Sequence, residues 1–303
     1  SAGYAAYPGD GSNYLELLKS ANYSLEYSKI MGKNRMTVFS RDILADRERR
    51  LELMELLRES VERGFAGFSI HYQPQVDTVS GRLCGAEALA RWHCTKYGDV
   101  SPGEFIPLME QSGLIIPFGQ WILSRGMAQC LEWCRFRPDF QISVNLSYIQ
   151  LAQGDFISFL RTALEEHSLA PSKIILELTE TYLAKAEEDT LRMIAQMKEL
   201  GVKIAMDDFG VGYSSLFSLK SIPVDVVKID RGFVKGITSD LFNATFIRSI
   251  TDLCHDVGRK VCLEGVETEE EYEAVRELGM EYIQGYYFGR PMSARQFEDR
   301  LKE

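Results

Sequence analysis

The sequence predicts an α/β fold in which eight strands close into a (β/α)8 barrel, with one strand antiparallel to the others. Eight short apolar runs read as strands, and longer stretches with helical periodicity, such as residues 189–200 and 268–278, separate most of them. Strands that alternate with helices form a parallel sheet. Eight such units over roughly 260 residues match a closed barrel of the TIM type better than an open sheet.

A shorter α/β fragment is expected before the barrel. Residues 14–31 have a partial helical periodicity, and residues 36–39 read as a short strand. A charged stretch then leads into a second helix. We therefore expect a domain boundary at this point, with an α/β fragment at residues 1–41 and the barrel at residues 42–303.

The connection between the first two barrel strands is too short to hold a helix. The eight predicted strands are residues 68–76, 82–90, 141–146, 173–178, 203–208, 225–230, 260–266 and 282–288. Residues 77–81 between the first two look like a hairpin turn, so one of these strands must run antiparallel. We expect the reversed strand to be the second one, which carries Glu87.

Polar side chains stand at or near the ends of nearly all predicted strands, where a buried strand would otherwise be apolar. They are Glu87, Asn145, Glu177, Asp207, Asp208, Lys228, Glu264 and Gln284. The carboxyl ends of parallel barrel strands converge on one mouth, where active sites of this fold lie. A single such residue is often a helix N-cap or a solvated loop residue. The whole set indicates a site, because charged side chains are rarely buried unpaired.

Carboxylates gathered at one mouth repel one another, which points to bound cations. Two unit charges ~4 Å apart cost ~4 kcal/mol at an effective dielectric constant of 20. Hard oxygen ligands, with one amide among them, suit Mg²⁺ or Mn²⁺. Two such ions can activate a water and stabilise in-line displacement at phosphorus, so the sequence predicts a two-metal site acting on a phosphate ester.

Overall charge cannot recruit an anionic substrate to this protein. The formal net charge of -10 argues against duplex nucleic acid or an anionic membrane surface as the main partner. Arg91, four residues after Glu87, is the best local candidate for holding a phosphate. The alternative for Arg91 is a surface salt bridge.

Other features of the sequence limit where in the cell the protein is expected to act. No apolar run reaches the ~18 residues that cross a bilayer, and no signal peptide is visible at the N-terminus. The six cysteines are scattered. Cys130 and Cys134 would share a helix face, but no second pair with zinc-finger spacing exists. A reduced, cytoplasmic protein is the simplest expectation, and a start at Ser1 without Met suggests a piece of a longer chain.

Many separated motifs together resemble one family, the EAL domain, across about residues 45–300. The motif that names the family is Glu87-Ala88-Leu89-Ala90-Arg91-Trp92. The others are Tyr72-Gln73-Pro74, Glu104-Phe105-Ile106-Pro107, Val144-Asn145-Leu146-Ser147, Leu176-Glu177-Leu178-Thr179-Glu180, Asp207-Asp208-Phe209-Gly210, Lys228-Ile229-Asp230-Arg231, Glu264-Gly265-Val266-Glu267-Thr268 and Gln284-Gly285-Tyr286.

The resemblance implies a phosphodiesterase that hydrolyses cyclic di-GMP to linear pGpG with two divalent ions, Mg²⁺ or Mn²⁺. By motif position, the implied ligands of the first ion are Glu87, Asn145, Glu177 and Asp207. The implied ligands of the second are Asp207 and Asp208, with help from Glu264.

The same resemblance implies roles around the ions. Lys228 and Glu264 would position and activate the attacking water, and Gln284 would hydrogen-bond near it. The implied substrate contacts are Gln73, Leu89 and Arg91. The implied supports of the loop after Asp208 are Glu180 and Glu267.

The loop after Asp208 departs from the family in one respect. Val211 stands where members of the family often have Thr, which removes a possible hydrogen bond. The Gly-x-Gly of Gly210 and Gly212 lacks the third glycine of a dinucleotide-binding turn. We therefore interpret the segment through Tyr213 as a flexible active-site loop, which in the family also contributes to a homodimer interface.

The first forty residues resemble the C-terminal end of a GGDEF domain, without its active-site loop. Residues 3–11 look like its late strand and turn, and residues 21–25 and 32–35 look like its last helix and exit. Two alternatives to an active phosphodiesterase stay open. One is a non-catalytic receptor for cyclic di-GMP, and the other is a metal-dependent barrel enzyme acting on carbon acids with Lys228 as base.

Overall fold

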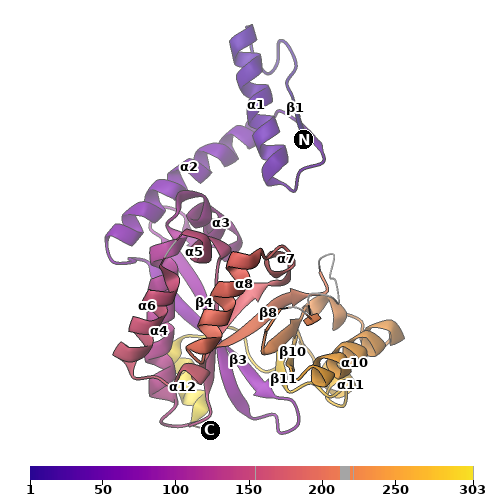
Figure 1. Cartoon of the computed structure of the whole chain (residues 1–303). Coiled ribbons are helices and arrows are strands. Elements are labelled where there is room, and N and C mark those ends of the chain that lie inside the picture. The colour runs from indigo at the N-terminus through magenta and orange to yellow at the C-terminus, as the bar shows by residue number, and fades with distance from the viewer. Residues whose placement is uncertain (154, 212–218, 221, 303) are drawn as a thin grey trace. The chain divides into compact units, whose positions relative to one another are not determined.

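The protein has two compact parts in the computed structural model (Figure 1). The structure describes residues 1–153, 155–211, 219–220 and 222–302. One part comprises residues 1–66 and 103–112, and the other comprises residues 67–102 with the remainder of the chain from residue 113. This division follows spatial contacts, and the boundary expected between residues 41 and 42 stays a prediction.

The first part contains two short parallel strands that flank a helix. Strand β1 (Ala2–Tyr4) pairs in parallel with β2 (Met36–Val38), and α1 (Tyr14–Ile30) connects them. The predicted helix and strand are therefore confirmed. The other helices of this part are α2 (Arg41–Glu62) and α3 (Pro102–Ser112).

The second part is a closed barrel of eight strands, as the sequence predicts. The strands are β3 (Phe68–Asp77), β4 (Leu83–Cys94), β6 (Gln141–Asn145), β7 (Ile174–Thr179), β8 (Lys203–Phe209), β9 (Val226–Ile229), β10 (Lys260–Glu264) and β11 (Tyr282–Gln284). Their order in the sheet is β3-β11-β10-β9-β8-β7-β6-β4, and pairing of β4 with β3 closes the ring. Strand β5 (Gly98–Val100) adds to β4 outside the ring.

The reversed strand is β3 and not, as expected from the sequence, the strand that carries Glu87. Strand β3 is antiparallel to both of its neighbours, β4 and β11. Strand β4 runs parallel to β6 and so shares the direction of the remaining strands. The hairpin itself is confirmed: Gly81 at its end has φ +64°, and the Ser80 N–H donates to the Asp77 carboxylate at 2.8 Å.

Helices lie around the barrel strands (Figure 1). They are α4 (Ile115–Trp133), α5 (Tyr148–Gln153), α6 (Phe156–His167), α7 (Glu180–Leu183), α8 (Glu188–Glu199), α10 (Leu241–Asp256), α11 (Glu269–Val275) and α12 (Ala294–Leu301), with 3-10 turns η1 (Pro171–Lys173) and η2 (Arg231–Phe233). Thr268 and Ser293 begin α11 and α12 with capping boxes, which satisfy orphan backbone donors. No helix among the described residues is both long and apolar enough to span a membrane.

An aromatic cluster fixes α4 and α12 against β3. Trp133 is fully buried and stacks on Phe297 of α12, with ring centroids 4.4 Å apart. Tyr72 of β3 meets Trp133 edge-on at 4.7 Å, and Phe140 does so at 5.4 Å. Because Tyr72 is followed by Gln73 and Gln75 on the inner face of β3, this packing sets where those two side chains enter the barrel.

Replacing Trp133 with Ala should lower the free energy of unfolding by roughly 3–5 kcal/mol, because it leaves a cavity in this cluster. Urea unfolding followed by circular dichroism measures the loss. Phe136→Ala is the matched control, since this aromatic side chain is 43% exposed and should cost less than about 1 kcal/mol. Equal losses for the two variants would contradict the importance of the cluster.

Candidate active site

The strand register brings the predicted polar side chains together at one end of the barrel. Asn145 at the end of β6 lies opposite Glu177 of β7, and Glu264 at the end of β10 lies opposite Gln284 of β11. Since β4 runs parallel to β6, Glu87 belongs to the same end. The position of Glu87 at the mouth therefore follows directly from the topology.

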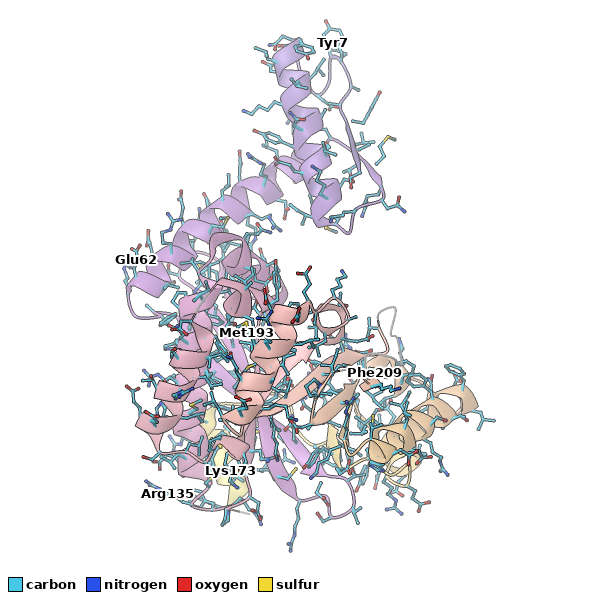
Figure 2. The ribbon with its side chains drawn as sticks, in the orientation of Figure 1. Tyr7, Glu62, Arg135, Lys173, Met193 and Phe209 are labelled. Atoms are coloured by element: carbon cyan, nitrogen blue, oxygen red, sulfur yellow. The ribbon has the colours of Figure 1, made fainter. Side chains whose placement is uncertain are left out.

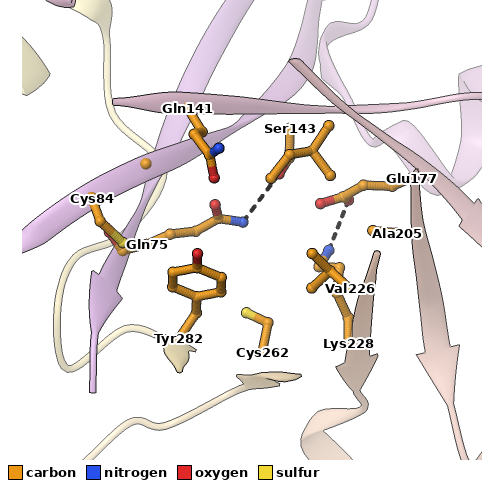
Figure 3. Close-up of a pocket in the computed structure, with 12 residues that line it drawn as sticks. Gln75, Cys84, Gln141, Ser143, Glu177, Ala205, Val226, Lys228, Cys262 and Tyr282 are labelled. Atoms are coloured by element: carbon orange, nitrogen blue, oxygen red, sulfur yellow. Dashed lines mark hydrogen bonds and ion pairs between the residues drawn. The ribbon is translucent and has the colours of Figure 1, made fainter. Parts of the chain in front are cut away.

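The ammonium of Lys228 lies among four carboxylates, and Figure 3 shows its ion pair with one of them, Glu177. Its Nζ is 2.7 Å from Glu177 Oε2, 2.7 Å from Glu264 Oε1, 3.1 Å from Asp207 Oδ1 and 3.5 Å from Glu87 Oε2. The lysine side chain is only 2% exposed. Four strands thus direct one acid each at a single buried cation on a fifth strand.

This crowding changes how readily the buried groups ionise. Burial lowers the pKa of Lys228, but the charges of Asp207, Glu177 and the other acids outweigh it, so the pKa lies well above the usual value. Burial and then the neighbouring Glu87 charge raise the pKa of Glu177 well above its usual value. Burial raises the pKa of Glu264 to about 7, against the opposing effect of Lys228. One ammonium therefore compensates only part of the negative charge.

Glu87 is the acid best supported by hydrogen bonds. Its Oε1 accepts from the Asn145 amide at 2.7 Å, and its Oε2 accepts from the Gln284 amide at 2.6 Å. Burial raises the pKa of Glu87, but Lys228 and the two amides outweigh it, so the pKa lies below its usual value. Glu87 is therefore held as a carboxylate although it is buried, with only 6% of its surface exposed.

The adjacent acids Asp207 and Asp208 sit at an irregular point of β8. Pairing with β9 shifts register between Met206 and Phe209, and Asp208 has φ +57°. A bulge of this kind lets neighbouring side chains depart from strict alternation. Asp207 is buried near Lys228, whereas Asp208 is exposed. Burial and then the Asp207 charge raise the pKa of Asp208.

Glu180 contacts the start of the loop after β8. Strand β8 ends at the buried Phe209, which Figure 2 labels. The next residue, Gly210, has φ +100°, and its N–H donates to Glu180 Oε2 at 3.0 Å. The following Val211 is 66% exposed. Residues 212–218, including Gly212 and Tyr213 of the predicted loop, lie outside the described residues.

A cavity opens beside the carboxylates at the barrel mouth. Gln73 and Leu89, two predicted substrate contacts, line it together with Glu87, Asp207, Glu264 and Gln284. Glu267 also lines the cavity, and its support of the loop after β8 stays a prediction. Arg91 is half-buried, and its guanidinium donates to the Ala90 carbonyl at 2.8 Å. Burial lowers the pKa of Arg91.

Sequence reasoning missed three polar side chains of this region. Arg231 and Tyr286 line the cavity, and both were visible only as members of motifs. Gln75 lies one layer deeper in the barrel and contacts Gln284 and Ser143. Alternation along β3 could have indicated Gln75, because it shares the inner face with Gln73.

The donor set fits divalent ions in its chemistry, although the carboxylates here face Lys228. Among the residues that the structure describes, no three His, Cys, Asp or Glu side chains form a group that could hold an ion. Glu177 Oε1 is nevertheless buried without a hydrogen-bond partner in that same set of residues. Buried polar atoms of this kind call for a partner such as an ion or water. All six cysteines are free.

The family model of the EAL domain matches residues 54–291. The chain belongs to the EAL domain family. It is 39% identical over 297 residues to the bifunctional diguanylate cyclase/cyclic di-GMP phosphodiesterase MucR of Pseudomonas aeruginosa, covering 98% of this chain and 43% of that protein. It is 33% identical to the cyclic di-GMP phosphodiesterase NbdA of the same organism, covering 100% of this chain and 38% of that protein. The chain thus spans less than half the length of these relatives.

Solved EAL structures superpose on the chain. The PaMucR phosphodiesterase in complex with c-di-GMP is 40% identical, with a TM-score of 0.75, covering 81% of this chain and 99% of that one. The EAL enzyme Bd1971 in its cAMP- and cyclic-di-GMP-bound form is 29% identical, with a TM-score of 0.79, covering 95% of this chain and 75% of that one. These EAL relatives confirm the barrel fold.

Replacing Lys228 with Met should lower the free energy of unfolding by roughly 3–5 kcal/mol, because the buried carboxylates lose their shared cation. Urea unfolding of the metal-free protein at pH 7 measures this loss. The control is Lys198→Met, whose ammonium pairs with Asp225 at 2.7 Å but is 32% exposed. That variant should lose less than about 1 kcal/mol. A Lys228→Met protein as stable as the control would show that the cluster does not need its lysine.

Proposed function

We propose that this EAL domain hydrolyses cyclic di-GMP to linear pGpG. The observation that carries the proposal is the group of buried carboxylates beside Lys228, which opens on a cavity at the barrel mouth. Support comes from two relatives whose names include cyclic di-GMP phosphodiesterase, and from a solved relative in complex with c-di-GMP.

Two divalent ions, Mg²⁺ or Mn²⁺, fit the excess negative charge of this site. The ligands of the first would be Glu87, Asn145, Glu177 and Asp207, and those of the second would be Asp207 and Asp208 with help from Glu264. Such ions supply a water of lowered pKa and neutralise charge that develops on the phosphate. The unpartnered Glu177 Oε1 supports this assignment, because it offers a buried oxygen that no other described group uses.

The protein's own groups then orient the water and the diester. Lys228 and Glu264 position the attacking water. The Glu264 carboxylate takes its proton, because Lys228 is held as an ammonium by the acids around it. The water oxygen forms a bond to phosphorus and the bond from phosphorus to the ribose 3′-oxygen breaks. The leaving 3′-oxygen takes a proton from Glu264, which received it from the water, or from bulk water. Gln284 would hydrogen-bond near this water. Gln73 and Leu89, which line the cavity, hold the substrate at the mouth. Arg91, which does not line the cavity in this structure, would also contact the substrate.

The same proposal covers the preceding domain, the oligomeric state, the location and the partners of this chain. We infer that residues 1–41 are the end of a GGDEF-like domain, which the parallel pairing of β1 with β2 around α1 supports. We also infer a cytoplasmic homodimer in which the loop after Asp208, supported by Glu180 and Glu267, takes part in the interface. Acidic composition supports the expectation that neither duplex nucleic acid nor a membrane is a partner of this fragment.

Turnover of cyclic di-GMP tests the proposal directly. The unaltered chain with Mn²⁺ should release linear pGpG, and a chelator should stop the reaction. Glu87→Gln, which keeps the shape but removes a ligand charge, should lower kcat/KM by roughly 100-fold or more. The control is Glu132→Gln on α4, whose side chain is 52% exposed, and it should have no effect.

Two other outcomes of this assay would contradict parts of the proposal. Tight binding of cyclic di-GMP without turnover in Mg²⁺ or Mn²⁺ would identify a receptor, the alternative that Val211 suggests. A normal rate for Glu87→Gln would contradict the assignment of the metal ligands.

A further inference from the structure

The geometry points to Gln75 as a positioning residue that fixes the orientation of the Gln284 amide and, through it, the carboxylate of Glu87. This inference rests on the proposed function, because it concerns a side chain below the proposed metal site. Gln75 is 8% exposed and lies on β3, directly opposite Gln284 of β11 in the strand register. The two amides therefore share the inner face of the barrel.

The hydrogen bonds that link Gln75, Gln284 and Glu87 all run in one direction from donor to acceptor. Gln75 Nε2 donates to Gln284 Oε1 at 2.9 Å, and Gln284 Nε2 donates to Glu87 Oε2 at 2.6 Å. A glutamine amide has one accepting oxygen and one donating nitrogen. When the oxygen of Gln284 is occupied by Gln75, its nitrogen must face Glu87. A reversed amide would bring the Gln284 oxygen against a carboxylate, which is repulsive.

The barrel interior has space for the Gln75 side chain because the residue that faces it is a glycine. Figure 3 shows this side chain extending toward Ser143, whose Oγ lies 3.4 Å from Gln75 Nε2. Gly85 of β4 faces Gln75 across the hairpin. A Cβ added at Gly85 would lie 3.0 Å from Gln75 Oε1 and 2.9 Å from the backbone oxygen of Gln141. A larger residue at position 85 would therefore crowd both the Gln75 amide and the β6 backbone at Gln141.

Glu87 thus accepts hydrogen bonds from two amides that are held in place differently. Asn145 reaches it from the exposed rim of the mouth, and Gln284 reaches it from the buried side, where Gln75 holds it. Residues that orient a metal ligand commonly change metal affinity or activity by roughly 10- to 100-fold when they are replaced. Gln75 is in that position with respect to Glu87, although it contacts neither the cavity nor the proposed ions.

The variant Gln75→Met tests the inference, because it keeps the length and approximate volume but removes the donor. We expect Mn²⁺ affinity, measured by isothermal titration, and kcat/KM for cyclic di-GMP each to fall by roughly tenfold or more. Gln141→Met is the matched control, since Gln141 lines the same interior but donates to the Ser172 carbonyl instead. It should change neither quantity more than about twofold.

Equal effects of Gln75→Met and Gln141→Met, or an unchanged Mn²⁺ affinity in Gln75→Met, would overturn the inference. Failure of the proposed function would look different. The unaltered protein would then bind Mn²⁺ without hydrolysing cyclic di-GMP, and the comparison of Mn²⁺ affinities would still test Gln75. An unaltered protein that binds no Mn²⁺ would overturn both. A crystal structure of Gln75→Met should also show the Gln284 amide moved away from Glu87 Oε2.

Discussion

A single buried ammonium surrounded by acids is the constraint on which the rest of this structure depends. Lys228 contacts carboxylates from four different strands of the barrel. Each of these acids is costly to bury alone, and together they repel one another. The lysine makes the cluster tolerable, yet it compensates only part of the charge. The cluster is therefore stable enough to form and still attractive to further cations.

Support for the cluster comes from neutral amides rather than from more charge. Asn145 and Gln284 donate to Glu87, and Gln75 donates to Gln284. Amides can orient a carboxylate without cancelling its charge, so the acid keeps its ability to bind an ion. The aromatic cluster of Trp133, Tyr72 and Phe297 holds β3 in place from outside. Packing outside the barrel and polar order inside it are linked through this one strand.

The barrel and the membership of the site could be predicted because both follow from local patterns. Alternating strands and helices indicate the closed sheet, and parallel strands bring their ends together wherever the ring closes. These two patterns are enough to place Glu177, Lys228 and Glu264 in one site. The hairpin between the first two strands is equally visible in the sequence, because five residues cannot hold a crossover helix.

What could not be predicted depends on long-range pairing. Which hairpin strand is reversed is decided by β11, which is distant in sequence and pairs antiparallel with β3. For this reason the strand of Glu87 was expected to run in the wrong direction, although the position of Glu87 at the mouth was right. The contacts of Gln75 depend on the same pairing. The different burial of Asp207 and Asp208 depends on a bulge in β8. The sequence Asp-Asp alone does not predict this bulge.

Anomalous diffraction at the manganese edge, from crystals grown with Mn²⁺ and cyclic di-GMP, would show directly whether the carboxylates around Lys228 bind metal. We expect two manganese peaks at the barrel mouth, with Glu87, Glu177 and Asp207 turned to them and Lys228 still beside the acids. Bound cyclic di-GMP with no manganese near these carboxylates would contradict this expectation.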